Sequence, residues 1–500
     1  MPADLKVLVT TAEVQPLIKT GGLADVTGAL PAALRKLGVD ARVLLPAYRG
    51  LTDQIPTRVV SRTFETLPTV RRLRLLQGEL PDSGVPVYLI DCPTLYDRPG
   101  NPYADQHGKD HWDNALRFGV LGKVAAQFGR PDGPIDWRPD IVHGHDWHAG
   151  LASAYLAFDP EVAAAGVFTI HNLAYQGNFD RKVRHALAID SLAFHMRGLE
   201  FHGHLSFMKS GLFYADQVTT VSPTYAQEIL QPSHGCGMDG VLREHSGQLT
   251  GILNGIDRKV WDPANDPALR ATYGRDDLSG KAVCRDDLCE WTEIDCEGPV
   301  IGMLGRMTSQ KGWDLFLDAA PRMVEAGARL VMLGEGHEDY EAQIAVLRER
   351  FPGRLVHLGT FREDTAHRLI AGCDMLVVPS RFEPCGLVQM YALRYGTLPI
   401  VHRTGGLADS VTALTPASLA DGSGTGFLFD RPTASDLAAC AREALALYHD
   451  DPAAWRDAQR NAMGRDLGWQ RSAADYVEVY ENALERRRQR PAVGAPPSRA

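Results

Sequence analysis

Two short segments of this chain combine glycine with a hydroxyl and a basic residue in a pattern suited to binding an anion. The six residues Thr-Gly-Gly-Leu-Ala-Asp occur at 20–25 and again at 404–409, preceded by Lys19 and by Arg403. Each copy follows an apolar run and opens a helix-like stretch. That order presents backbone N–H groups at a helix N-terminus, where a phosphate is stabilised. The alternative is a simple turn, which glycine pairs after strands commonly form.

A second group of chemically capable residues stands where apolar runs end in the first half of the chain. The run HGHDWH spans 143–148, and His171 ends a later apolar run. Three histidines around a carboxylate would suit a metal ion. Alternate residues of a strand share one face, so we expect His143 and His145 on one face and His148 in the next helix. We therefore favour polar groups lining a ligand site over a zinc site.

A third group lies in the second half. Arg306 lies just past the apolar run VIGMLG, and Lys311 follows five residues later. The segment SRFEPCGLVQ (380–389) places Glu383 in a loop and Gly386 at a helix start. Paired cations and a helix N-terminus are suited to an anionic ligand. The alternatives are a solvated pair of surface charges and, for Glu383, a helix cap.

The elements that must position these residues follow an α/β pattern in the first half. Six apolar runs are typical of buried strands: KVLVT, ARVLLP, PVYLID, DIVHGH, GVFTIH and QVTTVS. Helical stretches separate several of them. Residues 56–90 predict a β-hairpin inserted into the sheet. Residues 180–206, which hold four histidines, predict a loop with a short helix.

Strand–helix alternation is regular in the second half, after a polar stretch that follows residue 257. Strands alternating with helices of this length imply a parallel sheet covered on both faces. We expect an α/β protein with two Rossmann-like domains, 1–257 and 258–467, and a cleft between them. Ligands of such sheets bind beyond the carboxyl ends of the strands. The Arg/Pro/Ala-rich residues 489–500 predict a disordered tail.

Composition narrows the class of protein. The 500 residues are 44% hydrophobic and 23% charged, with a net charge of −10, which argues against broad nucleic-acid binding. The sequence has no apolar run near eighteen residues, so we expect no membrane span. It enters a strand almost at once, so we expect no leader peptide. The eight cysteines form no CxxC pair, and we expect free thiols in a reducing cytosol.

Taken together, the motifs resemble one enzyme family. KTGGLADV, LYDRPGNPY, HGHDWHAGL, FTIHNLAYQG, SFMKSGLFYADQVTTVSPTYAQEI, LNGID, RMTSQKG, PSRFEPCGL and RTGGLADSV stand in the order found in bacterial glycogen synthases. These are retaining glucosyltransferases of family 5, related to plant starch synthases. The resemblance runs from about residue 5 to about residue 480.

The resemblance implies a GT-B fold and a cytoplasmic enzyme without a metal or other cofactor. Its donor would be ADP-glucose and its partner an α-1,4-glucan (glycogen), which grows at the non-reducing end. Residues 468–488 would form a helix that crosses back to the first domain. The resemblance does not settle the oligomeric state, and it gives the preference for ADP over UDP without a residue that explains it.

The resemblance also implies roles for individual residues. Arg306 and Lys311 match the pair that stabilises the departing diphosphate. Glu383 matches the carboxylate near the sugar. His171 would approach the opposite face of the sugar with its carbonyl and the 6-hydroxyl with its ring. Asp146 and Tyr103 match donor- and acceptor-side positions. The matching substrate-binding residues are Lys19, Gly21, Gly22, Tyr103, Asn254, Cys385, Gly386, Leu387 and Thr404.

Some features depart from the pattern or leave alternatives open. Tyr391 stands where retaining relatives in other families carry a second glutamate, which speaks against a covalent glutamyl intermediate. The loop 106–113 has a less familiar composition. A sugar-nucleotide 2-epimerase and a catalytically silent glucan-binding protein are the competing functions. The second glycine motif, at 404–409, is either a ligand loop near the sugar or a structural turn.

Overall fold

The computed structural model describes residues 5–61, 66–70, 73–360 and 362–489. The chain divides into two compact units, which we describe one at a time. Unit 1 comprises residues 1–255 and 469–500, and unit 2 comprises residues 256–468. The boundary predicted from the sequence, after Asp257, lies two residues further along the chain. Residues 490–500 of the expected disordered tail lie outside the described residues.

Unit 1 is built on a nine-stranded sheet with the order β12-β11-β7-β6-β1-β2-β5-β4-β3. Its strands are β1 (Lys6–Thr10), β2 (Asp40–Pro46), β3 (Arg58–Ser61), β4 (Arg74–Glu79), β5 (Pro86–Asp91), β6 (Ile141–His145), β7 (Ala165–Ile170), β11 (Gln217–Thr220) and β12 (Leu249–Gly251). Neighbours from β12 to β5 run parallel, whereas β4 pairs antiparallel with both β5 and β3. The antiparallel edge is the hairpin that the sequence predicts within 56–90.

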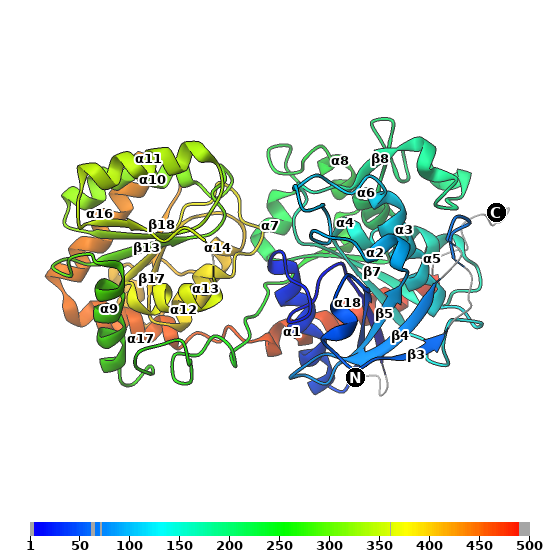
Figure 1. The fold of residues 1–500 in the computed structure, drawn as a ribbon, viewed down its shortest axis with the longest axis horizontal. Coiled ribbons are helices and arrows are strands. Elements are labelled where there is room, and N and C mark those ends of the chain that lie inside the picture. The colour runs from blue at the N-terminus through cyan, green and yellow to red at the C-terminus, as the bar shows by residue number, and fades with distance from the viewer. Residues whose placement is uncertain (1–4, 62–65, 71–72, 361, 490–500) are drawn as a thin grey trace. The chain divides into compact units, whose positions relative to one another are not determined.

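The helices of unit 1 cover both faces of this sheet. They are α1 (Gly22–Lys36), α2 (Pro93–Tyr96), α3 (Asn114–Phe128), α4 (Asp146–Ala149), α5 (Leu151–Phe158), α6 (Phe207–Tyr214), α7 (Pro223–Glu228), α8 (Asp239–Glu244) and α18 (Trp469–Gln489), with short 3-10 turns at Leu51–Asp53 and Ser246–Gln248. Helix α18 packs against α1, β6, β7 and β11, and its Trp469, Tyr476 and Tyr480 enter the main core of the unit. The last helix of the chain therefore belongs to the fold of the first unit (Figure 1).

The segment 180–206 differs from the predicted loop and short helix. It holds two 3-10 turns, Arg181–Arg184 and Ser191–Ala193, and the strands β9 (Glu200–Phe201) and β10 (His204–Ser206). These strands form a small antiparallel sheet with β8 (Asn178–Asp180). Strands of two or three residues leave no readable alternation of apolar and polar residues, which is why the pattern did not reveal them.

Unit 2 contains a six-stranded parallel sheet with the order β15-β14-β13-β16-β17-β18. Its strands are β13 (Val300–Leu304), β14 (Arg329–Leu333), β15 (Leu355–His357), β16 (Met375–Val378), β17 (Leu398–His402) and β18 (Phe427–Phe429). Numbered within the unit, this order is 3-2-1-4-5-6, so the winding reverses between β13 and β16. In such sheets a ligand binds at this reversal, beyond the carboxyl ends of the two strands.

Helices lie on both faces of the second sheet (Figure 1). They are α9 (Ser279–Thr292), α10 (Trp313–Glu325), α11 (Glu338–Arg350), α12 (Glu363–Gly372), α13 (Val388–Arg394), α14 (Gly405–Ser410), α15 (Pro416–Ala420), α16 (Ala434–Asp450) and α17 (Pro452–Met463). Helices α10 and α11 lie on one face, and α12, α13 and α17 lie on the other. Helix α9 falls in the polar stretch after residue 257 and was missed, because its charged residues mask the helical period. Within the described ranges of the chain, no helix has the length and apolar character needed to cross a membrane.

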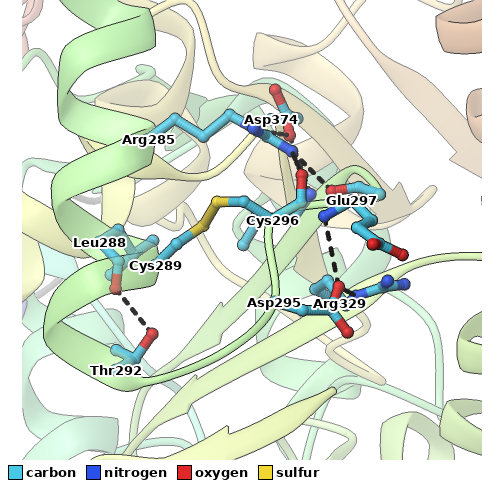
Figure 2. The surroundings of a disulfide bond; sticks show 11 residues. Arg285, Leu288, Cys289, Thr292, Asp295, Cys296, Glu297, Arg329 and Asp374 are labelled. Carbon is cyan, nitrogen blue, oxygen red and sulfur yellow. Dashed lines mark hydrogen bonds and ion pairs between the residues drawn. A yellow bond between two sulfur atoms is a disulfide. The ribbon is translucent and has the colours of Figure 1, made fainter. Parts of the chain in front are cut away.

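The prediction of free thiols is wrong for two of the eight cysteines. Cys289, near the end of α9, forms a disulfide with Cys296 (Figure 2). Helix α9 ends at Thr292, and its C-cap Glu293, with a φ of 56°, turns the chain back, so the two Cα atoms lie 6.0 Å apart, within the range for a disulfide. The spacing of seven residues contains no sign of this turn. Arg285 of α9 holds the same segment by donating to the carbonyl oxygens of Cys296 and Gly298.

Reducing this disulfide is expected to lower the stability of unit 2. Opening a loop of this length releases chain entropy in the unfolded state worth about 2–3 kcal/mol. Thermal unfolding with and without a dithiol reductant would measure the loss. A variant with serine at both Cys289 and Cys296 should unfold at the lower temperature and be insensitive to the reductant. Equal unfolding temperatures for all samples would contradict a stabilising role.

Candidate functional site

The predicted residues of unit 1 gather beyond the carboxyl ends of three neighbouring parallel strands. Strand β1 precedes the first glycine loop, β6 ends at His145 and precedes Asp146, and β7 ends just before His171. Because β6 pairs in parallel with both β1 and β7, these three ends lie at one edge of the sheet. The winding of the sheet also reverses between β1 and β6, which is where a ligand is expected.

A buried carboxylate that the sequence reasoning missed organises the first glycine loop. Glu13 accepts hydrogen bonds from the backbone N–H groups of Thr20 and Gly21 and from the hydroxyl of Tyr103. Burial raises its pKa, and these three hydrogen bonds oppose the rise. The loop thus does hold an anionic group with its N–H groups, and that group is a side chain of the protein. The available signal was an acidic residue just after the first strand.

Other predicted residues of unit 1 surround this loop. Lys19 forms an ion pair with Asp25 of the same motif, with 2.6 Å between Nζ and Oδ1. Gly22 begins α1, so its N–H lies in the first turn of that helix. The ring of Tyr103 stacks on that of His148, with 4.7 Å between their centroids.

Asn254 lies three residues after the end of β12 and is 5% exposed. Its Oδ1 is buried and finds no hydrogen-bond partner among the described residues. A buried acceptor without a partner is costly to a fold, so each one calls for an explanation. Asn254 is therefore a candidate for contact with a ligand group that donates a hydrogen bond.

Asp146 fixes the backbone at the end of the neighbouring strand. Its Oδ1 accepts hydrogen bonds from the N–H groups of His171, at 2.8 Å, and Asn172, at 3.3 Å. Burial raises the pKa of Asp146 to about 7, and the two backbone hydrogen bonds act in the opposite direction. Its φ of 54° places a non-glycine residue in the left-handed region, and such strain concentrates at functional sites. Asp146 and His171, predicted separately, are thus in direct contact.

Three histidines of this edge, His143, His145 and His171, are hydrogen-bonded to other protein groups. The two ring nitrogens of His143 bond to the hydroxyls of Tyr480 and Thr169, at 2.9 and 2.6 Å. His145 Nδ1 bonds to His171 Nε2 at 2.9 Å. His148 lies in α4, as the sequence predicts. Within the described part of the chain, no group of three His, Cys, Asp or Glu residues is arranged to hold a metal ion.

Acidification below pH 6.5 is expected to destabilise unit 1 through His143. Burial lowers the pKa of His143 to about 3 in the folded protein, against an ordinary value near 6.5. The imidazole of His143 therefore becomes protonated near pH 6.5 in the unfolded chain and stays neutral in the folded chain down to about pH 3. The free energy of unfolding is highest above pH 6.5 and falls as the pH is lowered towards 3. At pH 5 the loss amounts to about 2 kcal/mol.

Urea unfolding at pH 5, 6 and 7 would measure this effect. The His143→Asn variant lacks the titrating ring. The difference in unfolding free energy between wild type and variant should therefore shrink by about 2 kcal/mol from pH 7 to pH 5. A difference that does not change with pH would show that His143 titrates normally in the folded protein.

The predicted residues of unit 2 lie at the reversal of its own sheet. Arg306 follows β13 and is exposed, and no described residue forms an ion pair with it. Lys311 stands two residues before α10 and is half-buried. Its Nζ donates to Glu383 Oε2 at 2.7 Å, so the cation and the carboxylate predicted on separate loops form an ion pair.

Glu383 is buried and does not cap α13. The same Oε2 accepts a second hydrogen bond, from Ser380 Oγ at 2.8 Å. The N-cap of α13 is Leu387, which makes no side-chain cap. The two loops are joined a second time, because Arg381 contacts both carboxylate oxygens of Asp314, at 2.8 and 2.6 Å. Lys311 is therefore not part of a solvated pair of surface charges, and Glu383 is not a helix cap.

The segment from Cys385 to Leu387 forms the tight entry to α13. Gly386 has a φ of 69°, in the left-handed region, and Leu387 follows as the N-cap. The side chain of Gln389 donates to the carbonyl oxygens of Cys385 and Gly386, at 3.1 and 2.9 Å, and so fixes this turn.

Tyr391 occupies the position of the absent second glutamate. It is 7% exposed. Its ring is stacked on that of Trp261, with 3.7 Å between the centroids. This position thus packs an aromatic ring into the unit rather than supplying a carboxylate.

The second glycine motif supports the Glu383 loop. Its Thr404 is the N-cap of α14, and the N–H of Gly406 donates to the carbonyl oxygen of Glu383 at 3.0 Å. A Cβ atom on Gly405 would overlap that carbonyl oxygen, and one on Gly406 would overlap the carbonyl of Cys385. The glycines are therefore needed for close backbone contact, and the motif positions the segment that carries Glu383.

Alanine at Gly405 is expected to destabilise unit 2, whereas alanine at Gly21 is not. Gly405 has a φ of 42° and no room for a Cβ, so overpacking and strain together should cost about 1–3 kcal/mol. Gly21 holds the same place in the first copy, has an extended φ of −158°, and would meet nothing within 4 Å. Thermal unfolding of the two variants checks this, and equal loss or equal tolerance would contradict it.

Two family models match the chain. The model for the starch synthase catalytic domain matches residues 6–244, and the model for group 1 glycosyl transferases matches residues 290–462. The first range falls within unit 1 and the second within unit 2.

Several relatives match over almost the whole chain. The glycogen synthase of Thioalkalivibrio sulfidiphilus is 48% identical over 96% of this chain and 100% of its own length. That of Dechloromonas aromatica is 46% identical over 97% of this chain and 100% of its own length. That of Yersinia enterocolitica is 47% identical over 95% of this chain and 99% of its own length.

Solved structures agree with these relatives. The catalytic domain of Starch Synthase IV from Arabidopsis thaliana, bound to ADP and acarbose, matches with a TM-score of 0.85 and 30% identity over 96% of this chain and 99% of that one. A sucrose-phosphate synthase from Thermosynechococcus elongatus matches with a TM-score of 0.58 at 17% identity, over 96% of this chain and 99% of that one, which shows the fold alone. The expected GT-B fold is therefore confirmed. The chain belongs to the bacterial glycogen synthase family and is a glycosyltransferase that lengthens a glucan.

Proposed function

We propose that this chain transfers glucose from ADP-glucose to the non-reducing end of an α-1,4-glucan with retention of the anomeric configuration. The observation that carries the proposal is the pairing of Lys311 with the buried Glu383 at the reversal of the second sheet, beside the exposed Arg306. Support for the nucleotide comes from the starch synthase structure with ADP bound. A cytoplasmic location belongs to the same proposal.

The proposed reaction develops opposite charges on the two sides of the bond that breaks. Breaking the glucosyl–phosphate bond builds negative charge on the departing ADP and positive charge at the anomeric carbon. Arg306 and Lys311 stabilise the first charge, and Glu383 stabilises the second or orients the sugar hydroxyls. Pre-positioned charges of this kind lower the barrier because they need no reorganisation during the reaction. The ion pair between Lys311 and Glu383 holds both side chains in place beforehand.

The backbone and the other unit supply the remaining contacts of the proposal. The N–H groups of Cys385, Gly386 and Leu387 bind the distal phosphate at the entry to α13. The proposed contact of Lys19 with a donor phosphate requires this residue to exchange its ion pair with Asp25. Residues 1–257 carry the acceptor side of the reaction, and residues 258–467 bind the sugar nucleotide.

Retention without a covalent intermediate fits the site. Tyr391 supplies no second carboxylate, and its ring is stacked within the unit. We therefore propose that the acceptor hydroxyl attacks the face from which ADP departs, and that the departing phosphate oxygen takes the acceptor proton. His171 and Asp146 lie on the sugar side of the reaction in this scheme.

Glucan elongation assayed with ADP-glucose and UDP-glucose side by side tests the donor. ADP-glucose should support the faster incorporation of glucose into a glycogen primer, with one nucleoside diphosphate released per glucose added. A preference for UDP-glucose would refute the proposed donor. Incubation with donor alone tests the competing epimerase, which would convert the sugar nucleotide without any glucan. A protein that binds glycogen and releases no nucleotide would be the silent glucan-binding alternative.

A further inference from the structure

The ring of His145 makes a buried contact at the end of β6. His145 is fully buried, and its Nδ1 lies 2.9 Å from Nε2 of His171 in a hydrogen bond. The other ring nitrogen of His145, Nε2, is buried without a hydrogen-bond partner among the described residues. The ring of His143 packs beside it, with 4.1 Å between the centroids.

Both members of this pair are neutral. Burial lowers the pKa of His171 to about 3 and that of His145 well below its ordinary value. A neutral imidazole carries one N–H, and its other nitrogen accepts. One hydrogen therefore lies between the two rings, and either His145 or His171 donates it.

The unpartnered nitrogen decides between the two arrangements. If His171 donated, His145 would accept at Nδ1 and carry its own hydrogen on Nε2, as a buried N–H without an acceptor. If His145 donates from Nδ1, its Nε2 holds only a lone pair. Buried backbone N–H groups without partners are rarer in proteins than buried backbone carbonyl groups without them, and we apply the same order to the imidazole nitrogens. The second arrangement is therefore the stable one, and it places the hydrogen of His171 on Nδ1.

We propose that His145 is a positioning residue that holds His171 in the Nδ1–H tautomer, so that His171 meets the donor sugar as a hydrogen-bond donor. The contact of His171 with the donor sugar rests on the proposed function. The tautomer of His171 rests on its hydrogen bond with His145. No described residue bonds to His171 Nδ1, and the residue is partly exposed. A ring fixed with N–H outward can donate to a sugar hydroxyl, and the opposite tautomer could only accept.

Two consecutive residues thus hold His171 from the end of β6. His145 sets the tautomer and orientation of its ring, and Asp146 accepts its backbone N–H at 2.8 Å. Tyr480 and Thr169 hold His143, which packs against His145. Removing a partner that fixes the tautomer of a metal-bound histidine typically costs 10- to 100-fold in activity, and we expect a loss of the same order here.

Nitrogen chemical shifts of His171 test the tautomer directly. The full-length protein labelled with ¹⁵N-histidine would be measured without substrates, and the His171 signals would be identified by their loss in His171→Gln. We expect the shift of a protonated nitrogen at Nδ1 and that of an unprotonated nitrogen at Nε2. The reverse assignment would overturn the proposal. This result does not depend on what the enzyme transfers.

Two substitutions of His145 test the consequence for activity. In His145→Asn the side-chain amide nitrogen takes the place of Nδ1 and can still donate to His171. In His145→Leu a methyl group takes that place, with similar volume and no donor. We expect the asparagine variant to keep kcat within about 3-fold of wild type and the leucine variant to lose about 10- to 100-fold. The Michaelis constant for ADP-glucose should change by less than about 3-fold in both.

The outcomes separate this proposal from the proposed function. Equal losses in the two variants, at equal thermal unfolding midpoints, would show that the hydrogen bond from residue 145 does not position His171. If the leucine variant fails to fold, the His171 shifts of the wild type still decide the tautomer. If the wild type elongates no glucan with either sugar nucleotide, the proposed function is wrong. The nitrogen chemical shifts of His171 then still decide the tautomer by themselves.

Discussion

Replacing Glu383 with alanine is expected to lower kcat by about 10²–10³-fold or more while the protein stays folded. The carboxylate is 6% exposed and accepts hydrogen bonds from Lys311 and Ser380, so its position is set before the substrate arrives. Its charge matters most when positive charge develops on the sugar. The loss should therefore appear in kcat rather than in the Michaelis constant.

Steady-state kinetics of three variants would isolate the charge of Glu383. Glu383→Gln keeps the shape of the side chain and loses the charge, so it should resemble Glu383→Ala. Glu325→Ala is a matched control, because Glu325 is an exposed carboxylate of α10 paired with Arg350 at 2.8 Å, and its activity should stay near that of wild type. A Glu383→Ala protein with full specific activity and a large loss of stability would instead assign Glu383 a purely structural role.

Replacing Arg306 with alanine is expected to lower kcat by a similar factor of about 10²–10³. The residue follows β13 at the reversal of the sheet and is exposed, and no described residue neutralises it by an ion pair. It can thus turn its full charge to the departing diphosphate, whereas Lys311 must share its charge with Glu383. The variant should fold normally, since the exposed guanidinium makes no ion pair with any residue that the structure describes.

Kinetics of Arg306→Lys and Arg322→Ala would complete this test. Lysine keeps the charge and loses the planar fork, so an intermediate activity is expected. Arg322 is an exposed arginine in the last turn of α10, far along the helix from the loop, and its replacement should leave activity unchanged. Activity near wild type in both Arg306→Ala and Lys311→Ala would remove the leaving-group role from this pair.

Most of the strand ends that carry the site could be predicted from the sequence, because the apolar runs before His171, Arg306 and Glu383 end in polar residues. The family motifs then named the residues at those ends. The ion pair of Lys311 with Glu383 could not be predicted, because it joins residues 72 positions apart. The same holds for Tyr103 and Glu13, which are 90 positions apart.

Other features could not be predicted from the sequence, because their local signals are weak or ambiguous. Helix α9 has charged residues on several sides, and the disulfide depends on the left-handed turn at Glu293. The two glycine motifs read alike, yet Gly21 stands in open space and Gly405 lies against the Glu383 carbonyl. The two motifs differ because other residues of unit 2 pack against the second copy. No pattern within six residues contains that information.

The most direct test of the account follows one transferred glucose by NMR. The purified protein would be incubated with ADP-glucose labelled with ¹³C at the anomeric carbon and with a short α-1,4-glucan. We expect the labelled carbon to appear in an α-1,4 linkage at the non-reducing end, with one ADP released per glucose. A β-linked product, or an epimerised sugar nucleotide without a longer glucan, would contradict it.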